Sequence, residues 1–246
     1  EDQVVITFSL GNTYYRAVQK PENFCPINGA IIEALHTLPT YYKHQVGNHI
    51  FGIKFKLGGL SCFSTTSFKN FNNLNTELEN YLGPSSEELL TKLGSLTTFE
   101  ERVDLFERYL EPLFLAERDI KWKRLQEFVK LLESQVEISS ARYKTITRSF
   151  IELTGITPKE YLQIRRINQS LAYFAHNKSS KNQELAELLG FYDTAHFNHT
   201  FKKFTGKTPQ SFVSEIEQMQ PNEFIEEFKQ YISPEHLLYN SSKKHK

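Results

Sequence analysis

The stretch ITRSFIELTGITPKEY, residues 146–161, decides the fold, because FNHTFKKFTGKTPQSF, residues 197–212, repeats its pattern 51 residues later. Both copies carry an apolar residue, a basic residue, Phe, Thr-Gly, Thr-Pro and an aromatic residue at matching positions. The apolar residue and the Phe four places later share one helix face. The Gly can end that helix in the left-handed conformation, and Thr-Pro can start another helix. The repeat therefore predicts a helix, a stop and a new helix, twice over.

The second copy is preceded by ELAELLG, residues 184–190, which predicts a short apolar helix ending at Gly190. A brief turn follows, and Asp193 is the predicted N-cap of a helix over residues 194–204. This is the pattern of a helix-turn-helix, whose second helix presents one face outward. The outward residues, suited to base edges and phosphates, are Thr194, Ala195, Asn198, His199, Lys202 and Lys203. A surface helix that binds no partner is the alternative interpretation.

The first copy is less regular and more basic. Its first helix, predicted at about residues 130–137, lacks the small-residue and Gly signals, since Ser139 stands where the second copy has Gly190. Its second helix, predicted from about Ala141, presents Arg142, Lys144, Thr145, Thr147 and Arg148. We therefore expect this unit to supply the larger share of phosphate contacts, and the second unit the sequence preference. The connecting helix, at about residues 158–175, would be roughly 25 Å long, near the roughly 34 Å between successive major-groove faces.

Charge is unevenly distributed along the chain, although its net value is zero. Residues 120–214 carry 15 Lys and Arg against 8 Asp and Glu, whereas residues 1–119 carry 10 against 15 and residues 215–246 carry 4 against 6. The middle stretch is therefore basic and the two flanking stretches are acidic. A basic stretch is typical of a module that binds a polyanion. On charge alone, a merely solvated helical surface is the alternative.

The first half of the chain shows the period of strands and then that of helices. In residues 50–57 apolar and other residues alternate, which predicts a strand ended by Gly58-Gly59, and from about Thr76 apolar residues recur at helical spacing. The predicted fold class is α+β, with a β-rich domain and its helices over residues 1–118. An all-α domain of two helix-turn-helix units joined by a long helix follows over residues 119–246. The charged run ERDIK marks the boundary, and a further helix, EFIEEFKQYI, is expected in the tail.

Longer stretches around the two copies carry a family resemblance. ELAELLGFYDTAHFNHTFKKFTGKTPQSF is similar to the second helix-turn-helix signature of the AraC/XylS family, and ARYKTITRSF with GITPKEYLQIRRINQSL is similar to the first. The family usually has Arg where this chain has His199, and His is a weaker, pH-dependent cation. The resemblance implies that both second helices enter adjacent major grooves. It implies base-reading roles for Lys144, Thr147, Arg148, Thr194, Ala195, Asn198 and His199.

The N-terminal half resembles the β-rich domain that precedes such DNA-binding halves in many bacterial regulators. The stretches that carry this resemblance are GAIIEALHT, FGIKFKLGG, FNNLNTELENYLG and EERVDLFERYL. It implies a cupin-like fold but no ligand, and a sensing or dimerisation role is our expectation for this domain. The candidate partners are therefore double-stranded DNA, RNA polymerase, a small-molecule effector in this domain and a second copy of the chain. Residues 100–115 could supply the dimer interface or pack on the β-rich domain instead.

Other kinds of site are not predicted. The three histidines within residues 36–49 match no metal-ligand spacing, and no catalytic constellation or cofactor motif is recognisable. We therefore expect no metal, no cofactor and no enzymatic activity. Cys25 and Cys62 are predicted to be free, buried thiols. No stretch reaches the roughly 18 apolar residues of a membrane span and no basic leader is present, which predicts a cytoplasmic protein without membrane contact.

The sequence thus predicts a sequence-specific DNA-binding regulator of transcription that uses two recognition helices. The alternative is an effector-sensing or protein-interaction module whose DNA-binding half is degenerate, which the irregular first copy favours. Binding to duplex DNA that weakens steeply with salt distinguishes the two.

Overall fold

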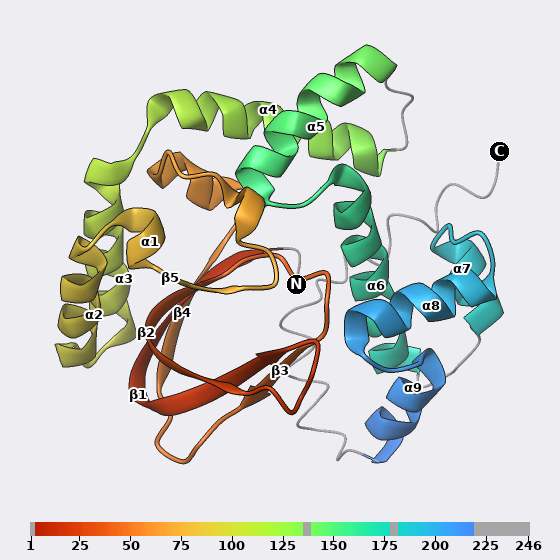
Figure 1. The fold of residues 1–246 in the computed structure, drawn as a ribbon, viewed down its shortest axis with the longest axis horizontal. Coiled ribbons are helices and arrows are strands. Elements are labelled where there is room, and N and C mark those ends of the chain that lie inside the picture. The colour runs from red at the N-terminus through yellow and green to blue at the C-terminus, as the bar shows by residue number, and fades with distance from the viewer. Residues whose placement is uncertain (1–2, 135–138, 178–181, 219–246) are drawn as a thin grey trace. The chain divides into compact units, whose positions relative to one another are not determined.

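The structure is a computed structural model that describes residues 3–134, 139–177 and 182–218 (Figure 1). The chain divides into two compact units, Glu1–Tyr161 and Leu162–Lys246. The first unit holds an antiparallel sheet, helices and the first copy of the repeat, and the second unit holds the second copy. The α+β fold class, with its β-rich part first, is confirmed. The unit division differs from the predicted domains because the first copy packs with the β-rich part, and the domain boundary after residue 118 stays a prediction.

One antiparallel sheet of five strands forms the base of the first unit. Strand β1 lies inside the sheet and pairs along one edge with β2. Its other edge pairs first with β4 and then with β3, while β5 extends the sheet beyond β2. The strands are β1 (Val4–Val18), β2 (Cys25–Glu33), β3 (Thr40–Lys43), β4 (Ile50–Phe55) and β5 (Asn75–Glu77). The strand predicted over residues 50–57 is β4, and the described residues hold fewer strands than a cupin jelly roll.

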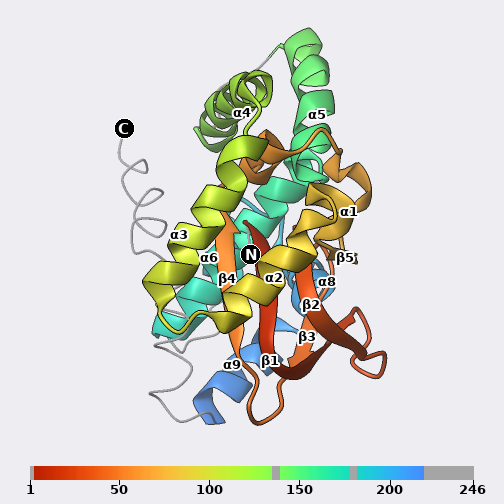
Figure 2. The ribbon, with the colours of Figure 1, turned by 90° about the vertical axis from the view of Figure 1, so that its left-hand side faces the viewer.

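Two helices cover one face of this sheet, as Figure 2 shows. Helix α2 (Ser85–Ser95) contacts β1 and β2. Helix α3 (Phe99–Leu110) sets the ring of Phe106 edge-on against that of Phe8, with the ring centroids 5.9 Å apart. Both rings are buried, so the inner side of α3 packs on the sheet. A second copy of the chain as a partner of this helix stays a prediction.

Buried charges lie among β1, β2 and the segment that follows β2. Arg16 is fully buried, donates a hydrogen bond to the Leu74 carbonyl (3.2 Å) and lies 2.7 Å from His36 Nε2. Glu33 accepts a hydrogen bond from Thr7 Oγ1 (2.7 Å), and its Oε2 lies 3.8 Å from Arg16 Nε. Burial, and then the charge of Arg16, lower the pKa of His36 to about 3. The neutral His36 ring can therefore accept a hydrogen bond from the guanidinium.

The helices after the sheet correct several expected boundaries. Helix α4 runs over Ala116–Glu133, so the charged run ERDIK lies inside a helix. The helix expected at residues 130–137 is the end of α4, and residues 135–138 and the expected tail helix lie outside the described residues. Cys62 is buried as predicted, but Cys25 is exposed, because it begins β2 directly after a loop. The remaining elements are η1 (Gly59–Phe63), η2 (Phe68–Asn70), α1 (Glu79–Leu82), η3 (Glu111–Leu113), α5 (Ser140–Thr154), α6 (Pro158–Asn177), α7 (Asn182–Leu188), α8 (Thr194–Thr205) and α9 (Pro209–Gln218).

Neither a membrane helix nor a metal site is found in the described part of the chain. No helix in residues 3–134, 139–177 and 182–218 has the length and apolar character needed to cross a bilayer. The same residues bring together no group of three or more His, Cys, Asp or Glu side chains suited to a metal ion. The candidate site is the pair of helix-turn-helix units, because they carry the residues predicted to bind DNA.

Candidate nucleic-acid interface

The second helix-turn-helix consists of α7, a turn and α8. Gly190 has a φ of 71° in the turn, a conformation that favours glycine. Asp193 caps α8, and its Oδ1 accepts a hydrogen bond from the backbone N–H of His196 at 2.7 Å. The predicted helix, its cap and its stop at Gly206, where φ is 78°, are confirmed.

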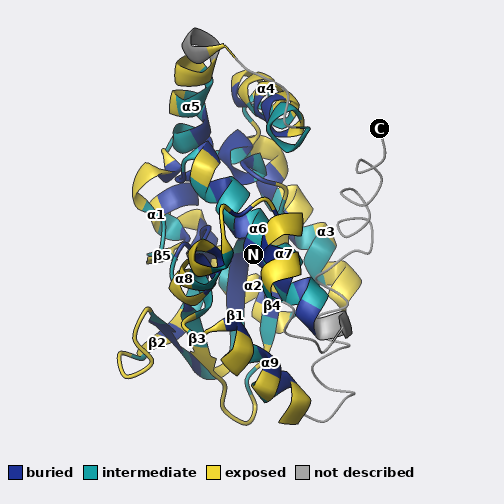
Figure 3. Ribbon diagram, turned by 90° about the vertical axis from the view of Figure 1, so that its right-hand side faces the viewer, coloured by how far each residue is buried: buried dark blue, intermediate teal, exposed yellow. Residues whose placement is uncertain are grey.

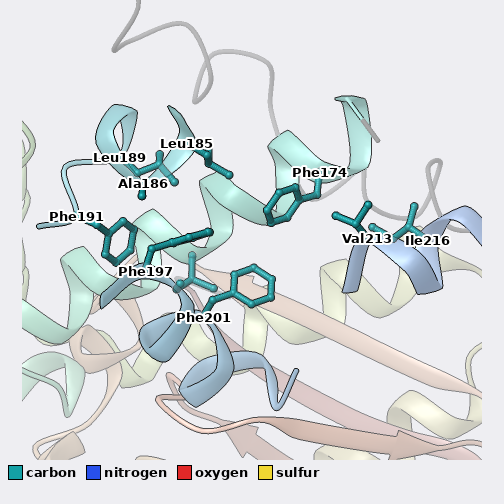
Figure 4. Packing of buried hydrophobic residues seen from close by; sticks show 10 residues of the cluster. Phe174, Leu185, Ala186, Leu189, Phe191, Phe197, Phe201, Val213 and Ile216 are labelled. Carbon is teal, nitrogen blue, oxygen red and sulfur yellow. The ribbon is translucent and has the colours of Figure 1, made fainter. Parts of the chain in front are cut away.

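Aromatic side chains hold α8 against the helices around it. Phe197 and Phe201 are fully buried, with ring centroids 5.8 Å apart, and Phe201 lies 5.8 Å from Phe174 of α6. Figure 4 shows these rings among the flanking helices. The buried cluster comprises Ile167, Phe174, Leu185, Ala186, Leu189, Phe191, Phe197, Phe201, Val213 and Ile216. Because residues four apart share a helix face, this packing leaves the opposite face of α8 to solvent.

The exposed face of α8 carries two imidazoles and ends in two lysines. Its exposed residues are Ala195, His196, His199, Lys202 and Lys203. His196 was not among the outward residues predicted from the sequence. It precedes His199 by three residues and Lys203 by seven, which is the spacing of one helix face. Tyr192 in the preceding turn is 92% exposed and extends this surface. The structure thus brings four predicted residues together with two that were not predicted.

Two residues expected to point outward from α8 are half-buried instead. Thr194 and Asn198 are both partly covered, and the Oδ1 atom of Asn198 is buried without a hydrogen-bond partner. Asn198 precedes the buried Phe201 by three residues and so lies beside it on the helix surface. Thr147 holds the equivalent position in the first copy, and its Oγ1 is buried and unpartnered as well. The expected orientation is corrected for these residues, and their role in DNA binding stays a prediction.

Arg166 of α6 supports the turn that leads into α8. Its guanidinium carbon lies 5.6 Å from the centroid of the Phe191 ring, a cation–π contact. Phe191 in turn meets the His196 ring at 5.4 Å between centroids, with an interplanar angle of 77°. Burial lowers the pKa of Arg166, but an arginine in a protein stays charged. Ring contacts therefore link α6, through the turn, to the exposed face of α8.

The first helix-turn-helix consists of α4 and α5. Lys144 and Arg148 are exposed on α5, as predicted, and Thr145 is exposed beside them. Arg142 lies in the first turn of α5, but its side chain is outside the described ones. Figure 3 shows exposed residues near the start of α5 and more buried residues toward its end. The basic surface of α5 therefore includes Lys144 and Arg148 and does not reach the end of the helix.

Both copies end one helix at a glycine with a left-handed φ and begin the next helix at a threonine cap. Gly155 has a φ of 79°, close to the 78° of Gly206. In the first copy Thr157 Oγ1 accepts a hydrogen bond from the Glu160 backbone N–H at 3.2 Å, and Glu160 Oε2 accepts from the Thr157 backbone N–H at 2.8 Å. In the second copy Thr208 Oγ1 accepts from a backbone N–H at 3.2 Å. The predicted stop and restart are confirmed twice, with a full capping box in the first copy.

The C-terminal half of α5 packs on the segment that joins η1 and η2. Glu152 accepts a hydrogen bond from Arg118 Nη1 at 2.6 Å and lies 3.5 Å from Lys121 Nζ. Arg118 is buried and also donates to the Thr65 carbonyl at 2.6 Å. Ser67 Oγ donates to the Glu152 carbonyl at 3.4 Å. Glu152 therefore ties α5 to α4 and to the β-rich part of the chain.

Two glycines allow this close approach. A Cβ on Gly155 would lie 2.6 Å from both the Phe68 carbonyl oxygen and Asn72 Oδ1. A Cβ on Gly58 would lie 2.5 Å from Leu125 Cδ2 of α4. Real Cβ atoms do not approach other atoms so closely, so larger residues at these positions would push the segments apart.

Equivalent positions of α5 and α8 carry different chemistry. Arg148 of α5 holds the position that His199 holds in α8. The two exposed lysines that end α8 have Ile151 and Glu152 as counterparts, and both are half-buried. The first copy therefore exposes a permanent charge in mid-helix, whereas the second exposes a titratable ring and two terminal lysines.

A comparison with known protein families identifies the part of the chain that holds these units. A family model described as a helix-turn-helix domain matches residues 136–215, which include both copies of the repeat. This part of the chain is an AraC-type helix-turn-helix domain. The resemblance drawn from the sequence motifs is thereby confirmed.

Curated relatives of this AraC-type domain are bacterial. The HTH-type transcriptional regulator RipA of Corynebacterium glutamicum is 30% identical over 83 residues, which cover 34% of this chain and 24% of the relative. The HTH-type transcriptional regulator YidL of Escherichia coli is 33% identical over 73 residues, which cover 30% of this chain and 24% of the relative. The matched stretch spans about a quarter of the length of these two relatives.

Solved structures of ToxT from Vibrio cholerae are also similar. One, from strain O395, is 13% identical with a TM-score of 0.39, covering 87% of this chain and 89% of that chain. Another, bound to an unsaturated fatty acid, is 12% identical with a TM-score of 0.38, covering 86% of this chain and 87% of that chain.

Proposed function

We propose that the protein is a sequence-specific DNA-binding regulator of transcription. One observation carries the proposal: both helix-turn-helix units expose polar and basic side chains on a second helix whose other face is packed. Two relatives that share the AraC-type domain are named as HTH-type transcriptional regulators. On this proposal α5 and α8 enter adjacent major grooves.

Base and phosphate contacts divide along each exposed face. Lys202 and Lys203 can pair with phosphates at the end of α8, while His199 presents a short polar tip to base edges. In the first unit Arg148 can donate two hydrogen bonds to one guanine, and Lys144 can pair with a phosphate. RNA polymerase, a small-molecule effector and a second copy of the chain belong to the proposal as further partners, and no reaction is part of it.

Selection from random duplexes, followed by affinity measurements over a range of salt concentrations, tests the proposal. The purified chain should recover a duplex motif, and its affinity should fall linearly on a log–log plot against salt. The double variant Lys202→Ala/Lys203→Ala should lower the slope of that plot by about 1 for each phosphate that the variant no longer neutralises. Lys92→Ala is the matched control, because Lys92 is an exposed lysine on α2 that pairs with Glu88 at 2.8 Å. Failure to recover any motif, with a slope that neither variant changes, contradicts the proposal.

A second candidate function is a sensing or protein-interaction module whose first DNA-binding unit is degenerate. The observation in its favour is that Ser67 and Asn72 of the β-rich part donate hydrogen bonds to the backbone carbonyls of Glu152 and Gly155 at the end of α5. Arg148→Ala separates the two candidates. If both units bind DNA, this variant should lose about 1 to 3 kcal/mol of binding free energy and relax the preference at one base pair. An unchanged affinity and motif favour the degenerate unit.

A further inference from the structure

We propose that His196 and His199 bind DNA as a pair of imidazolium ions, so that the second unit reads a different base pattern, and binds more tightly, at lower pH. The inference rests on the proposed function and deepens it. Both rings belong to exposed residues of α8, three positions apart and therefore on one side of the helix. This side continues to Lys203 at the end of α8, so the pair lies within the basic face and not at its border.

The surroundings of the two rings leave their polar atoms open to DNA. Asp193 is the nearest carboxylate along the chain, and it is engaged in capping the backbone N–H of His196. The His196 ring rests against Phe191, whose ring also meets Arg166. Among the described residues, neither histidine has an ion-pair partner. Among the described residues of this compact unit, the other charged groups are Lys202 and Lys203 of α8, Glu217 of α9 and the Lys207–Glu215 pair. Arg165 of α6 and Glu184 and Glu187 of α7 are charged as well, and each has a partner of its own.

The chemistry of imidazole connects protonation to base preference. A neutral ring has one donor and one acceptor, whereas an imidazolium has two donors and no acceptor. In the major groove guanine presents two acceptors, N7 and O6, while adenine presents an acceptor and a donor. Phosphates around a bound helix also favour the charged ring. Binding should therefore take up protons, and guanine and phosphate contacts should gain at lower pH.

The first unit lacks this property at the equivalent positions. Arg148 stands where α8 has His199, and Thr145 stands where it has His196. Arginine stays charged throughout the physiological range, and threonine does not titrate. The pH response should therefore belong to the half-site that α8 contacts and leave the other half-site unchanged.

Affinity of the full chain for its selected duplex, measured at constant ionic strength, tests this inference. Between about pH 8 and about pH 6, affinity should rise about tenfold for each histidine that binds as imidazolium. Selection at the lower pH should enrich guanine in one half-site. The double variant His196→Asn/His199→Asn should still bind, with less than about a threefold change over the same range. The control variant His44→Asn removes an exposed histidine of the β-rich part, far along the chain from α8. Its affinity for DNA should respond to pH as that of the wild type does.

His199→Arg provides a second, independent test. With a permanent charge at this position, the chain should bind at about pH 8 more tightly than the wild type, and its pH response should shrink to that of one histidine. A wild-type affinity that does not change with pH, or a response that survives in the double variant, overturns the inference while leaving the proposed function intact. Absence of salt-dependent duplex binding at both pH values overturns the proposed function, and this inference with it.

Discussion

The two helix-turn-helix units share one local pattern but are held in place differently. In each copy a threonine before the glycine donates a hydrogen bond four residues back along its helix, from Thr154 to Phe150 at 2.7 Å and from Thr205 to Phe201 at 2.8 Å. The second copy is held by its own aromatic cluster. The first also packs the ring of Phe150 on that of Phe128 in α4, but its end is held in addition by hydrogen bonds from the β-rich part to backbone carbonyls. Local sequence thus determines the helix, stop and restart, while the surroundings decide which part of the recognition helix stays exposed.

Position 152 shows how this difference reduces the DNA-binding surface. Glu152 anchors α5 to Arg118, and its counterpart Lys203 is exposed on α8. Ser67 and Asn72, on the segment around η2, donate to the carbonyls of Glu152 and Gly155. A helix end that is bound to its own protein cannot also lie in a groove of DNA. The shorter basic face of the first unit therefore follows from its attachment.

Gly155→Ala should have the largest effect on stability. The alanine would have to keep a left-handed φ and place its Cβ against the Phe68 carbonyl, which together should cost about 3 kcal/mol. Gly190→Ala in the second unit is the matched variant, because its nearest neighbour is an Arg166 atom at 3.7 Å. It should cost about 1 kcal/mol, the left-handed strain alone. Urea unfolding followed by circular dichroism measures both, and equal losses would show that the first unit is not crowded at its stop.

Acid should destabilise the compact unit that contains the sheet and the first copy of the repeat. Burial and the charge of Arg16 lower the pKa of His36 to about 3 in the folded state, whereas a histidine in an unfolded chain titrates near 6.5. The stabilisation is complete above about pH 6.5 and should be lost, by up to about 5 kcal/mol, as the pH falls toward 3. Trp122, the single tryptophan, donates to the Leu57 carbonyl and reports on this unit by fluorescence. His36→Gln should flatten the profile, and an unchanged profile would assign the acid sensitivity to other groups.

Exchanging charges at the equivalent positions 152 and 203 should separate stability from binding. Glu152→Gln removes the partner of the buried Arg118 and should cost about 2 kcal/mol of stability. Lys203→Gln should change stability by less than about 0.5 kcal/mol, because it is an exposed substitution. Its effect should instead appear as weaker duplex binding with a smaller salt dependence. Thermal unfolding and duplex titration of both variants make the comparison, and a destabilised Lys203→Gln would mean that α8 is also anchored through its end.

Local signals explain why the second unit was predicted almost completely. The helix expected over residues 194–204 is α8, and the cap at Asp193 and the stop at Gly206 are where the sequence puts them. Each depends on residues within one turn of the feature. His196 could have been found in the same way, since three-residue spacing places it beside His199.

Long-range contacts explain what the sequence did not predict. The run ERDIK was expected to lie between two helices, but it lies inside α4, where its Arg118 is buried against Glu152, 34 positions away in the chain. No periodicity indicates such a partner, because a charged run also fits an exposed linker. Asn198 was misplaced for a related reason. The width of the packed face depends on the neighbouring helices, which the spacing of Phe197 and Phe201 does not define.

The restart of the helix after each stop should show the smallest difference between the copies. Thr157 and Glu160 cap each other in the first copy, whereas the residue equivalent to Glu160 is Ser211. Thr157→Ala and Thr208→Ala should each cost about 1 kcal/mol, the usual loss of an N-cap. A double-mutant cycle of Thr157→Ala with Glu160→Ala should reveal a coupling of about 0.5 kcal/mol, because their hydrogen bonds are reciprocal. The cycle of Thr208→Ala with Ser211→Ala should show no coupling energy. Urea unfolding measures both cycles, and equal coupling energies would contradict the predicted difference between the two caps.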